Sequence, residues 1–538
     1  MDEYDYIIVG AGSAGCVLAA RLSENGRFKI LLLEAGPSDR RLWIQIPIGY
    51  GKTFYDPDVN WMYETQPEPG LDNRLIYQPR GKVLGGSSSI NAMVYSRGQE
   101  SDFATWEAMG NAGWGWNEVL AAYRRLEDHA LGPSPGHGSG GPMRVETIEH
   151  AAHPLISHFI RAGQEAGLPF NPDLNGESIE GVGLYQINTR RGFRLSASRA
   201  YLWPARRRAN LRVETGALAT KLRFEGRRAV GVSYEQRGRT VEARAGREVL
   251  VCGGAINTPQ LLQLSGVGPA DLLGRLGIEV VHHAPQVGAN LQDHLCYDHV
   301  YRCRLPSLNQ VLGPLGSKLR IGLRYLLLRS GPLSLSINQG GGFARTDLAQ
   351  TSPNMQLYFS PLSYERRVPR VRALTKPDAF PGFSTSVSPC RPTSRGTIAI
   401  RSADPRQAPS IQPNYLSTPE DVAELLGGAR LLRTLAATAS FQDIIRQELK
   451  PGPDCRSDDD LVSDIRARSY SVFHPCGSCR MGPDPAAAVV DPRLRLHGIA
   501  GLRVVDASIF PAITSGNTNA PTIMVGEKGA QLILADQG

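Results

Sequence analysis

Long apolar runs, cysteine and strongly biased charge are all scarce in this sequence of 538 residues. The longest apolar stretch, residues 6–22, is interrupted by glycines at 10, 12 and 15, so it is too short and too glycine-rich for a membrane span. The 8 cysteines are too few for a disulfide framework in a chain of this length. The acidic N-terminus runs directly into an apolar strand and shows no secretory signal. We therefore expect a cytoplasmic protein.

The charge is mildly positive. Lys and Arg number 59 against 51 Asp and Glu, a formal net charge of +8. Charged residues make up 20% and apolar residues 41% of the chain, which excludes a disordered charged tail and fits an ordinary globular protein. The densest basic cluster, Arg206 to Arg208, is typical of a solvated loop, and no nucleic-acid-binding motif accompanies it. We therefore expect no nucleic-acid partner.

The first 35 residues have the pattern of a strand, a glycine-rich turn, a helix and a second strand. Residues 5–10 and 29–34 are short apolar runs, as buried parallel strands require, and residues 16–22 are helix-like. Between them lies Gly10-x-Gly12-x-x-Gly15, in which the glycines permit a tight turn, close approach to a pyrophosphate and packing of helix on strand. Glu34 is the acidic residue expected on the ribose hydroxyls. The motif predicts a dinucleotide site without separating FAD from NAD.

Two later segments, residues 248–252 and 502–506, have the composition of further strands in the same parallel sheet. The first leads into a helix-like segment in which Pro259 suits the first helical turn. Residues 523–535 are also helix-like. These segments place a second half of the sheet far along the chain.

The texture changes between residues 296 and 402. Short β-type runs are separated by Gly, Pro and Ser, with no long helix between most of them, which predicts a mainly antiparallel sheet. The runs are 296–305, 339–345, 355–362, 383–389 and 396–401. We therefore predict an α/β protein, α+β overall. A Rossmann-type cofactor-binding domain with a parallel sheet takes residues 1–150, 205–295 and 455–538. A substrate domain with a mainly antiparallel sheet and helices takes 151–204 and 296–454.

Residues 308–334 mix Leu, Ile and Tyr with Lys318, Arg320, Arg324 and Arg329. A basic amphipathic helix of this kind can lie on a membrane surface. It can equally pack on the surface of its own domain, and this is the interpretation we favour.

Four further blocks carry chemistry: Pro79–Asn91, Gly254–Gly268, His474–Gly482 and Ser515–Thr522. In the first, Gly85-Gly86 is followed by hydroxyl residues, which fits an ordinary loop or a cofactor loop. Cys476-x-x-Cys479 could be a redox pair, part of a zinc site with His474, or two thiols that line a loop. The zinc interpretation lacks a convincing fourth ligand, so we expect no metal.

The five motif blocks, taken together and in this order, resemble the glucose–methanol–choline (GMC) family of flavin oxidoreductases. Residues 81–98 and 254–268 are similar to the family's two signature segments. His474 and Asn517, 43 residues apart, fall at the positions of its active-site pair. The resemblance extends over residues 5–535. The overall sequence pattern, including residues 60–65 and 290–294, is similar to that of the bacterial choline dehydrogenase and alcohol dehydrogenase branch.

The resemblance implies that FAD binds in the Rossmann-type domain and that an alcohol is oxidised by hydride transfer to flavin N5. An alcohol releases hydride readily only if its hydroxyl proton leaves too, and imidazole, with a pKa of about 6.5, is a suitable base near neutral pH. His474 is expected to be that base, and Asn517 to hold the substrate oxygen by a hydrogen bond. Pro521 marks the start of the last helix, whose N-terminus is expected to stabilise negative charge on the reduced flavin.

Carried over position by position, the resemblance implies three groups of contacts. The ADP half is expected to meet Gly10, Gly12, Ser13, Ala14, Gly15, Glu34, Ala35 and, through its backbone, Ala219. The pyrophosphate and flavin are expected along Gly85, Gly86, Ser87, Asn91, Ala92 and Val94, closed off by Asp506, Ala507, Asn517 and Thr518. The substrate pocket is expected to include Gln339, Tyr358, Phe359, Val472 and Phe473. Strand alternation allows at most one of Tyr358 and Phe359 to face the pocket.

Two positions depart from the family pattern. Some members attach FAD through a histidine just before the Asn of the Gly-Gly-Ser block, and here that residue is Ile90, so we expect non-covalent FAD. Choline-acting members place a Glu where Gln339 stands, and no acidic residue occurs from Ser330 to Arg345. Burying a quaternary ammonium requires a carboxylate or an aromatic cage. We therefore expect a neutral, apolar or aromatic primary alcohol as substrate.

The resemblance leaves the electron acceptor open between O2 and a quinone. Three alternatives to this function remain: a choline dehydrogenase-like enzyme or membrane-docked alcohol dehydrogenase that reduces quinone, a non-redox lyase, and a flavoprotein without turnover. The pairing of His474 with Asn517 favours oxidation. The sequence carries no signal for the oligomeric state.

Overall fold

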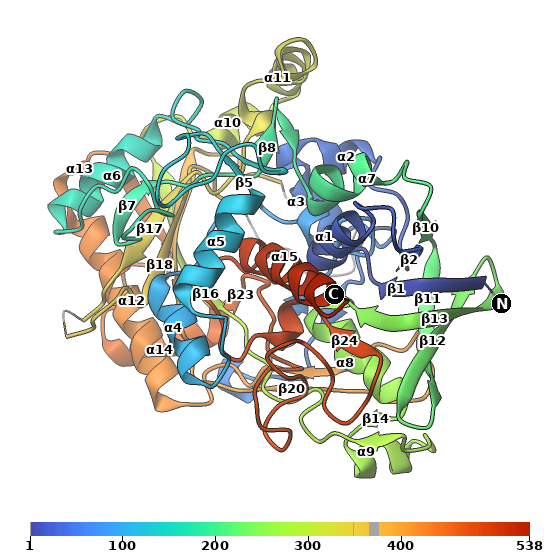
Figure 1. Ribbon diagram of the computed structural model, residues 1–538. Helices are drawn as coiled ribbons and strands as arrows, with labels where there is room; N and C mark the ends of the chain where they lie inside the picture. Colours follow the sequence, from blue (N-terminus) through green and yellow to red (C-terminus); the bar gives the residue numbers. More distant parts are fainter. Residues whose placement is uncertain (1, 348, 365–375, 538) are drawn as a thin grey trace.

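Two β-sheets, each covered by its own helices, organise the chain (Figure 1). The computed structural model describes residues 2–347, 349–364 and 376–537. Each sheet contributes to a separate large apolar core. The mixed α/β architecture, with one largely parallel and one antiparallel sheet, confirms the predicted fold class.

The first sheet contains all four of the strands predicted for it. Its order is β10 (Leu211–Thr215), β2 (Ile30–Glu34), β1 (Asp2–Val9), β13 (Arg239–Val251), β12 (Arg228–Gln236) and β11 (Ala217–Glu225), and β24 (Leu502–Val504) also pairs with β13. The pairs from β10 to β13, and β13 with β24, are parallel. The sequence analysis missed β10 and the antiparallel arm of β11, β12 and the first half of β13. Strand β10 extends the sheet beyond β2 at one edge, and β12 and β11 extend it beyond β13 at the other.

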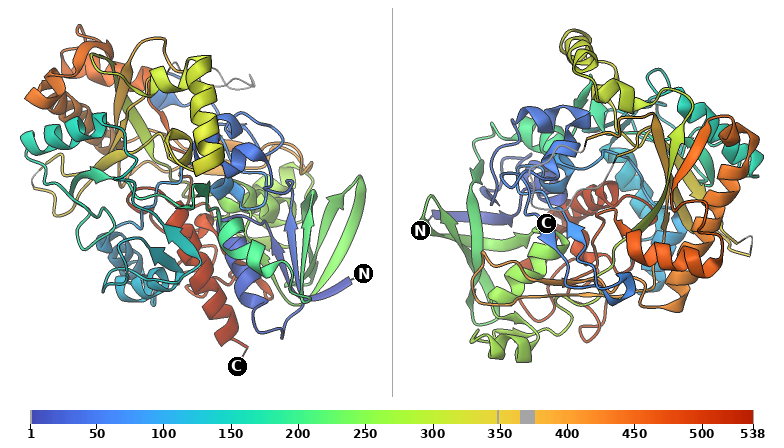
Figure 2. Two further views of the ribbon diagram at one scale, coloured as in Figure 1. Left: turned by 90° about the horizontal axis from the view of Figure 1, so that it is seen from above. Right: turned by 180° about the vertical axis from the view of Figure 1, so that it is seen from behind.

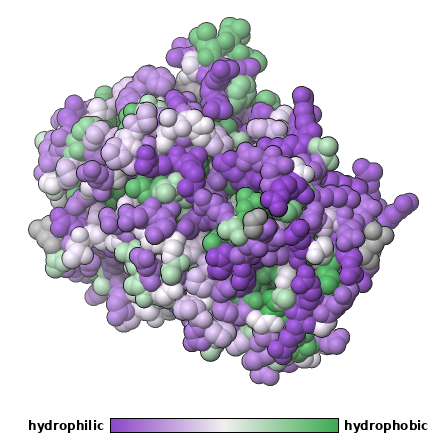
Figure 3. All heavy atoms as spheres, viewed as in Figure 1, coloured by the Kyte–Doolittle hydropathy of each residue, from purple (hydrophilic) through white to green (hydrophobic). Residues whose placement is uncertain are grey.

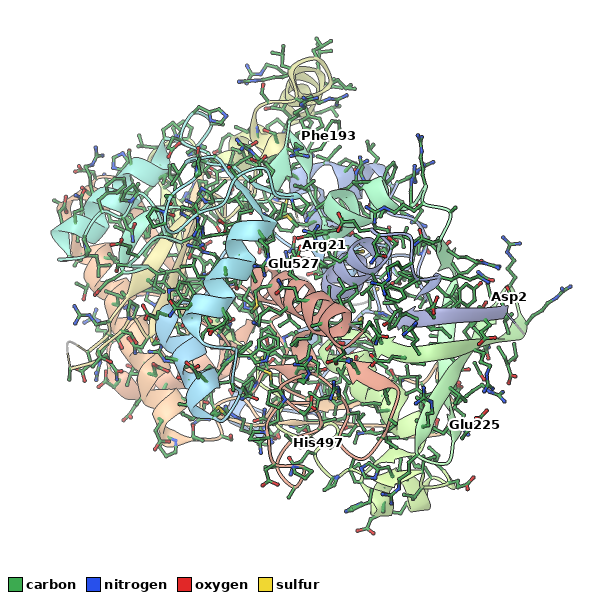
Figure 4. All side chains as sticks on the ribbon, viewed as in Figure 1. Asp2, Arg21, Phe193, Glu225, His497 and Glu527 are labelled. Carbon is green, nitrogen blue, oxygen red and sulfur yellow. The ribbon has the colours of Figure 1, made fainter. Side chains whose placement is uncertain are left out.

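Helices α1 (Ser13–Leu22) and α15 (Asn519–Ala535) pack against each other although they lie at opposite ends of the chain (Figures 1 and 2). A Cβ on Gly526 would lie 2.9 Å from Val17 Cβ, so the glycine permits this close approach. Arg21 and Glu527 join the two helices through a partly buried ion pair of 2.8 Å, which Figure 4 shows between them. The packing brings the N-terminal ends of both helices to one site.

Helix α8 (Gly254–Leu264) begins earlier than predicted, so Pro259 lies inside it and not in its first turn. A proline there cannot donate to the carbonyl of Ala255, four residues earlier. Ser478 Oγ donates to this carbonyl instead, at 2.5 Å. The side chain replaces the lost helical bond, which explains how the helix accommodates an internal proline.

The second sheet is antiparallel, as predicted. Its order is β17 (Gly340–Ala344), β18 (Met355–Ser360), β19 (Gly382–Pro389), β16 (Leu295–Cys303) and β22 (Ile445–Lys450), with β23 (Tyr470–Ser471) also paired to β16. The predicted run 396–401 does not belong to it, because β20 (Thr397–Ala399) pairs with β21 (Ser410–Gln412) in a separate two-stranded sheet. One face of the main sheet is covered by α6 (Leu155–Glu165), α12 (Pro419–Ala437) and α13 (Ala439–Gln442), with α14 (Asp458–Arg468) packed on α12.

The remaining elements are short or peripheral. The helices are α2 (Leu42–Gln45), α3 (Tyr50–Thr53), α4 (Glu100–Ala108), α5 (Trp116–Leu126), α7 (Trp203–Ala205), α9 (Ala270–Arg275), α10 (Leu308–Leu312) and α11 (Leu315–Leu328). The strands are β3 (Tyr63–Glu64), β4 (Tyr77–Gln78), β5 (Glu127–His129), β6 (Met143–Val145), β7 (Gly181–Leu184), β8 (Thr189–Arg190), β9 (Phe193–Arg194), β14 (Val267–Gly268) and β15 (His282–His283). Within the described residues, each helix is too short or too polar to cross a membrane.

We propose two domains that follow the two apolar cores. The first core, on the parallel sheet, includes side chains from residues 195–205. The second core, on the antiparallel sheet, includes Leu461 and Ile465 of α14. A division along the cores therefore moves these two segments across the boundaries expected from the sequence.

Candidate active site

A large cavity lies between the two sheets. Its first half is formed by residues at the carboxyl ends of β1, β2 and β13, among them Val9, Leu33 and Cys252. Its second half is formed by alternate residues on one face of the antiparallel sheet: Cys296, Asp298, Val300, Tyr358, Ser360, Ser384 and Ser386. The carboxyl ends of parallel strands are where open α/β sheets bind ligands. The cavity is therefore the candidate cofactor and substrate site.

The glycine-rich turn leads from β1 into α1 at the cavity wall. A Cβ on Gly10 would lie 2.5 Å from the carbonyl oxygen of Cys252, and one on Gly15 only 1.9 Å from that of Gly10. These two glycines therefore allow strand and helix to pack. Gly12 differs, because a Cβ there would meet nothing closer than 3.9 Å. Gly12 lines the cavity just before the N-terminus of α1, where free N–H groups suit a pyrophosphate.

Glu34 ends β2 with its carboxylate at the cavity. It accepts hydrogen bonds from the backbone N–H of Ala11 at 3.0 Å and of Gly36 at 2.8 Å. Burial raises the pKa of Glu34 to about 7, against the opposing effect of these hydrogen bonds. Two hydroxyl donors, such as those of a ribose, would compensate for this burial and stabilise the carboxylate.

The loop around Gly85-Gly86 presses directly on the glycine-rich turn. A Cβ on Gly86 would lie 2.8 Å from Gly12 Cα, and the φ angles of both Gly85 and Gly86 are positive. Asn91, which lines the cavity, accepts a hydrogen bond of 2.8 Å from Arg194 through its Oδ1 atom. Ile90 also lines the cavity and has no nucleophilic atom with which to bond a cofactor.

The predicted cofactor residues almost all line this cavity. They are Gly10, Gly12, Ser13, Ala14, Glu34, Ala35, Gly86, Ser87, Asn91, Ala92, Val94, Ala219, Asp506, Ala507, Asn517 and Thr518. Gly15 and Gly85 lie one layer behind, where they position the loops. The carboxylate of Asp506 accepts from Thr258 Oγ1 at 2.6 Å and from the backbone of Gly254 and Ser508, so it holds the start of α8 in place.

His474 and Asn517 meet at the cavity wall. His474 Nε2 and Asn517 Nδ2 are 3.0 Å apart. His474 Nδ1 lies 2.9 Å from His294 Nδ1, and His294 Nε2 lies 3.0 Å from the carbonyl oxygen of Cys390. A carbonyl only accepts, so His294 carries its proton on Nε2 and accepts at Nδ1. His474 then carries its proton on Nδ1, and its Nε2 lone pair faces Asn517 and the cavity.

The amide of Asn517 is held from its other side. Gln356 Nε2 donates to Asn517 Oδ1 at 3.3 Å, and Gln356 Oε1 accepts from Tyr358 at 2.6 Å. This chain of bonds directs the Asn517 N–H group toward His474. The backbone N–H of His474 donates to Asp293 at 2.7 Å, which fixes the main chain beside the ring.

The surroundings keep His474 neutral. Burial is the largest cause that holds the pKa of His474 well below its usual range, and the charge of Arg80 adds to it. Phe473 adopts a left-handed backbone conformation with φ of 70°, a strained state that is uncommon for a bulky residue. Arg80 donates to the carbonyl of Phe473 at 2.6 Å and stabilises this turn. As a result Phe473 and His474 both line the cavity.

The predicted substrate residues divide into two groups. Tyr358, Val472 and Phe473 line the cavity. The prediction is wrong for Phe359, because strand alternation turns it into the second core, where its ring lies 5.1 Å from that of Phe159. It is also wrong for Gln339, whose side chain is buried away from the cavity and bonds the backbone of His153 at 2.8 Å and of Ser336 at 3.3 Å.

Sequence reasoning missed four residues at the site. Asp293 and His294 were noted only within a segment that is similar to the family. An Asp followed directly by a His was the signal that could have found them, and the structure shows that both are buried. Gln356 and Asp298 had no local signal, because their positions depend on the register of the antiparallel sheet. Asp298 lines the cavity, and Gln356 bonds Asn517 at its wall. Asp298 forms an ion pair of 3.0 Å with Arg468.

Cys476 and Cys479 are free and fully buried. Burial raises the pKa of both thiols, so both stay protonated and unreactive at neutral pH. Their backbone N–H groups bond the carbonyls of Gln292 and Ser508. This arrangement supports the interpretation of two thiols in a loop.

Outside the cavity, the buried His129 and His137 and the half-buried Asp173 form a group of potential metal ligands. Both ring nitrogens of His137 are already engaged, Nδ1 with Glu127 at 3.1 Å and Nε2 with Asp173 at 2.7 Å. The ring of His129 stacks on that of His137 with centroids 3.8 Å apart, so the two rings do not point at a common centre. The geometry fits a doubly bonded imidazolium and not a metal site.

Comparison with known proteins agrees with this geometry. The family model described as GMC oxidoreductase matches residues 4–296 and 392–526. The chain is 44% identical over 538 residues to an alcohol dehydrogenase [acceptor] of Pseudomonas putida, covering 99% of this chain and 96% of that protein. It is 43% identical over 541 residues to a mitochondrial choline dehydrogenase of Homo sapiens, covering 99% of this chain and 90% of that protein.

Solved structures show the same fold. A pyridoxine 4-oxidase from Mesorbium loti superposes with a TM-score of 0.89 at 33% identity, covering 98% of both chains. A formate oxidase superposes with a TM-score of 0.91 at 27% identity, covering 99% of this chain and 98% of that chain. The fold and the cavity define a flavin-dependent oxidoreductase. The chain belongs to the GMC oxidoreductase family, and FAD is its cofactor. The open space beside Gly12 and the position of Glu34 fit the phosphates and ribose of that cofactor.

Proposed function

We propose that this protein oxidises a neutral primary alcohol to the aldehyde with FAD as the hydride acceptor. The observation that carries the proposal is the pair of His474 Nε2 and Asn517 Nδ2, 3.0 Å apart at the wall of the cofactor cavity. The neutral tautomer of His474 leaves a lone pair on Nε2, which is the atom a base requires.

His474, Asn517 and His294 have separate roles in this reaction. An alcohol hydroxyl between the two side chains donates its proton to His474 Nε2 and accepts a hydrogen bond from Asn517. The amide of Asn517 does not titrate, so it orients the oxygen without competing for the proton. His294 then stabilises the protonated ring of His474 by accepting from its Nδ1 atom. When bound, FAD accepts the hydride that leaves the carbon bearing this hydroxyl.

The wall near His474 supports an apolar or aromatic substrate. The rings of Tyr50, Phe54 and Phe473 line the cavity in edge-to-face contact, 5.4 and 5.5 Å apart. Asp298 on the antiparallel sheet is the observation that favours choline as a second candidate substrate. Arg468 pairs with this carboxylate at 3.0 Å but is shared with Asp464, so the support for the neutral alcohol comes from the aromatic wall.

A substrate panel separates the two candidates. We expect kcat/KM for benzyl-type or medium-chain alcohols to exceed that for choline by at least 10-fold. A clear preference for choline would show that Asp298, and not the aromatic wall, selects the substrate. Flavin bleaching under anaerobic conditions, followed by addition of oxygen or of a quinone analogue, identifies the acceptor, which we propose to be one of these two.

Replacement of His474 tests the mechanism. We expect His474→Ala to retain FAD and to slow flavin reduction roughly 100-fold or more, the scale of a lost general base. The exposed His150→Ala variant is the matched control and should reduce flavin at the parent rate. Near-normal reduction by the His474 variant would remove the basis of the proposal.

The attachment of FAD is tested by acid precipitation. Because Ile90 stands where some family members carry a linking histidine, we propose that FAD is held without a covalent bond. The yellow colour should then stay in the supernatant. Colour retained in the pellet would show a covalent link at another residue.

A further inference from the structure

Helix α11 projects from the rest of the molecule (Figures 1 and 2). Only Ile321 and Tyr325 are buried in it, and Tyr325 donates to the carbonyl of Gly192 at 2.9 Å. At the base of the helix the ring of Tyr325 also packs edge-on against Phe193, which Figure 4 labels. From the sequence we favoured packing of this helix on the surface of its own domain. That packing involves only the side of α11 that carries Ile321 and Tyr325, and it leaves the leucines of the helix exposed.

The opposite side of α11 is an exposed leucine face. At about 100° per residue, five leucines fall within about 120° of one another, on the side away from Ile321 and Tyr325. Each of them is 59–74% exposed; they are Leu315, Leu319, Leu323, Leu326 and Leu327. Figure 3 shows them as an apolar tip at the top of the molecule. Isolated exposed leucines are ordinary, but a contiguous group on a projecting helix marks an interaction site.

Cations border the leucine face on both sides. Lys318 lies along one edge, and Arg320 and Arg324 lie along the other. Within the described residues these three form no ion pair with a carboxylate. The sequence from 299 to 346 contains no Asp or Glu. A helix with an apolar face, basic flanks and no acidic residue matches the interface of an anionic bilayer.

A neighbouring patch adds to the same surface. Lys52 Nζ lies 3.2 Å from the ring centroid of Trp43, and Trp43 and Leu42 are both exposed. Burial and then the charge of Lys318 lower the pKa of Lys52, which places Lys52, a fourth cation, near α11. Tryptophan and lysine are residues that anchor proteins at the headgroup level.

We propose that α11 docks this protein on the surface of an anionic lipid bilayer, with the leucine face among the acyl chains and the flanking cations on the headgroups. A second copy of the chain is a poorer occupant, because it would bring the same cations against each other across the contact. The proposal does not depend on which alcohol is oxidised.

The docked surface lies beside the cavity. Helix α11 contacts residues 332–334, which in turn contact residues 47–49 next to Tyr50. Tyr50 accepts a hydrogen bond of 3.1 Å from the backbone of Ile337, and both residues line the cavity. Docking through α11 therefore brings this wall of the cavity toward the lipid, within reach of apolar molecules dissolved in it.

Vesicle sedimentation with the purified holoenzyme tests the proposal. We expect the parent to bind vesicles of phosphatidylcholine with about one quarter phosphatidylglycerol, and to bind less as salt rises. Leu319→Gln with Leu323→Gln should lower the partition coefficient roughly 100-fold, because each leucine gives up about a tenfold contribution. The matched control is Leu75→Gln with Leu131→Gln, which changes two leucines that are 54% and 52% exposed elsewhere and should bind like the parent.

A second variant separates charge from apolar contact. Lys318→Gln with Arg324→Gln should bind anionic vesicles roughly 25-fold more weakly, about fivefold for each charge, while its binding to pure phosphatidylcholine is unchanged. All variants should keep the flavin spectrum and the turnover with a water-soluble acceptor. No vesicle binding by the parent, or equal loss in the control variant, would overturn the proposal. A dimer that the α11 leucine changes dissociate, without lipid binding, would overturn it in favour of a second copy.

Discussion

The proton position on His474 depends on His294, and its removal should have a measurable cost. His294→Ala deletes the acceptor for His474 Nδ1–H at a buried site. A buried donor left without a partner costs about 1–3 kcal/mol. The ring can avoid this cost only by moving its proton to Nε2, which removes the lone pair that the reaction needs. We therefore expect flavin reduction at saturating alcohol to slow by roughly 10- to 100-fold.

His294→Asn is the matched variant, since its Oδ1 atom can accept at the position of the lost Nδ1 atom. We expect it to recover most of the rate. Neutral His294 accepts from His474 Nδ1–H and so stabilises the protonated ring of His474. In the Ala variant the pKa of His474 should therefore fall further, and the acid limb of the rate profile should move to lower pH. Stopped-flow bleaching of the flavin across pH measures both effects. An unchanged rate and unchanged profile in His294→Ala would refute the assignment of the tautomer.

Three further predictions concern groups near and far from the cavity. Cys476→Ser with Cys479→Ser should retain most of the turnover, and a loss as large as that of His474→Ala would show that the thiols take part. Because burial and neighbouring charge keep the pKa of His474 well below 6.5, the rate of flavin reduction should stay flat from about pH 8 to about pH 6; a fall centred near the usual histidine value would contradict this. Burial lowers the pKa of His137, but hydrogen bonds to Asp173 and Glu127 outweigh it and raise that pKa above its unfolded value. The stability that this gives is complete below about pH 6.5 and is lost as pH rises through the folded pKa, so His137→Gln should cost more free energy of unfolding at pH 6 than at pH 9. Denaturant titrations at pH 6 and pH 9 measure this cost. Equal costs at the two pH values would contradict the ion pairs of His137 with Asp173 and Glu127.

The cofactor half of the site could be predicted because its chemistry is local. Gly10, Gly12 and Glu34 are close in sequence, and each is restricted by backbone geometry that leaves few substitutes. His474 and Asn517 followed from the family resemblance, which carried positions that no local pattern would bring together. The structure adds the reason for their pairing, namely the bonds from His294 and Gln356.

The substrate half could not be predicted to the same degree. Which residues of an antiparallel sheet face a cavity depends on register, and a shift by one position exchanges the faces. Tyr358 and Phe359 are adjacent, yet one lines the cavity and the other the core. Gln339 stands just before the start of β17, where its side chain is used by the backbone of His153. Asp298 came into view only through the pairing of β16 with β19.

The contact between α1 and α15 also means that the cofactor site cannot be complete early in the synthesis of the chain. The hydrogen bond from Ser13 Oγ to Asn519 Oδ1 joins residues 506 positions apart, at the cofactor end of both helices. At about 5–20 residues per second, a ribosome needs roughly 25–100 s to add that length of chain. During this interval the apolar side of α1 lacks α15 as a partner, and the wall of the cavity beside Gly12 is incomplete. The flavin site is therefore complete only after residue 519 has been synthesised and α15 has packed on α1.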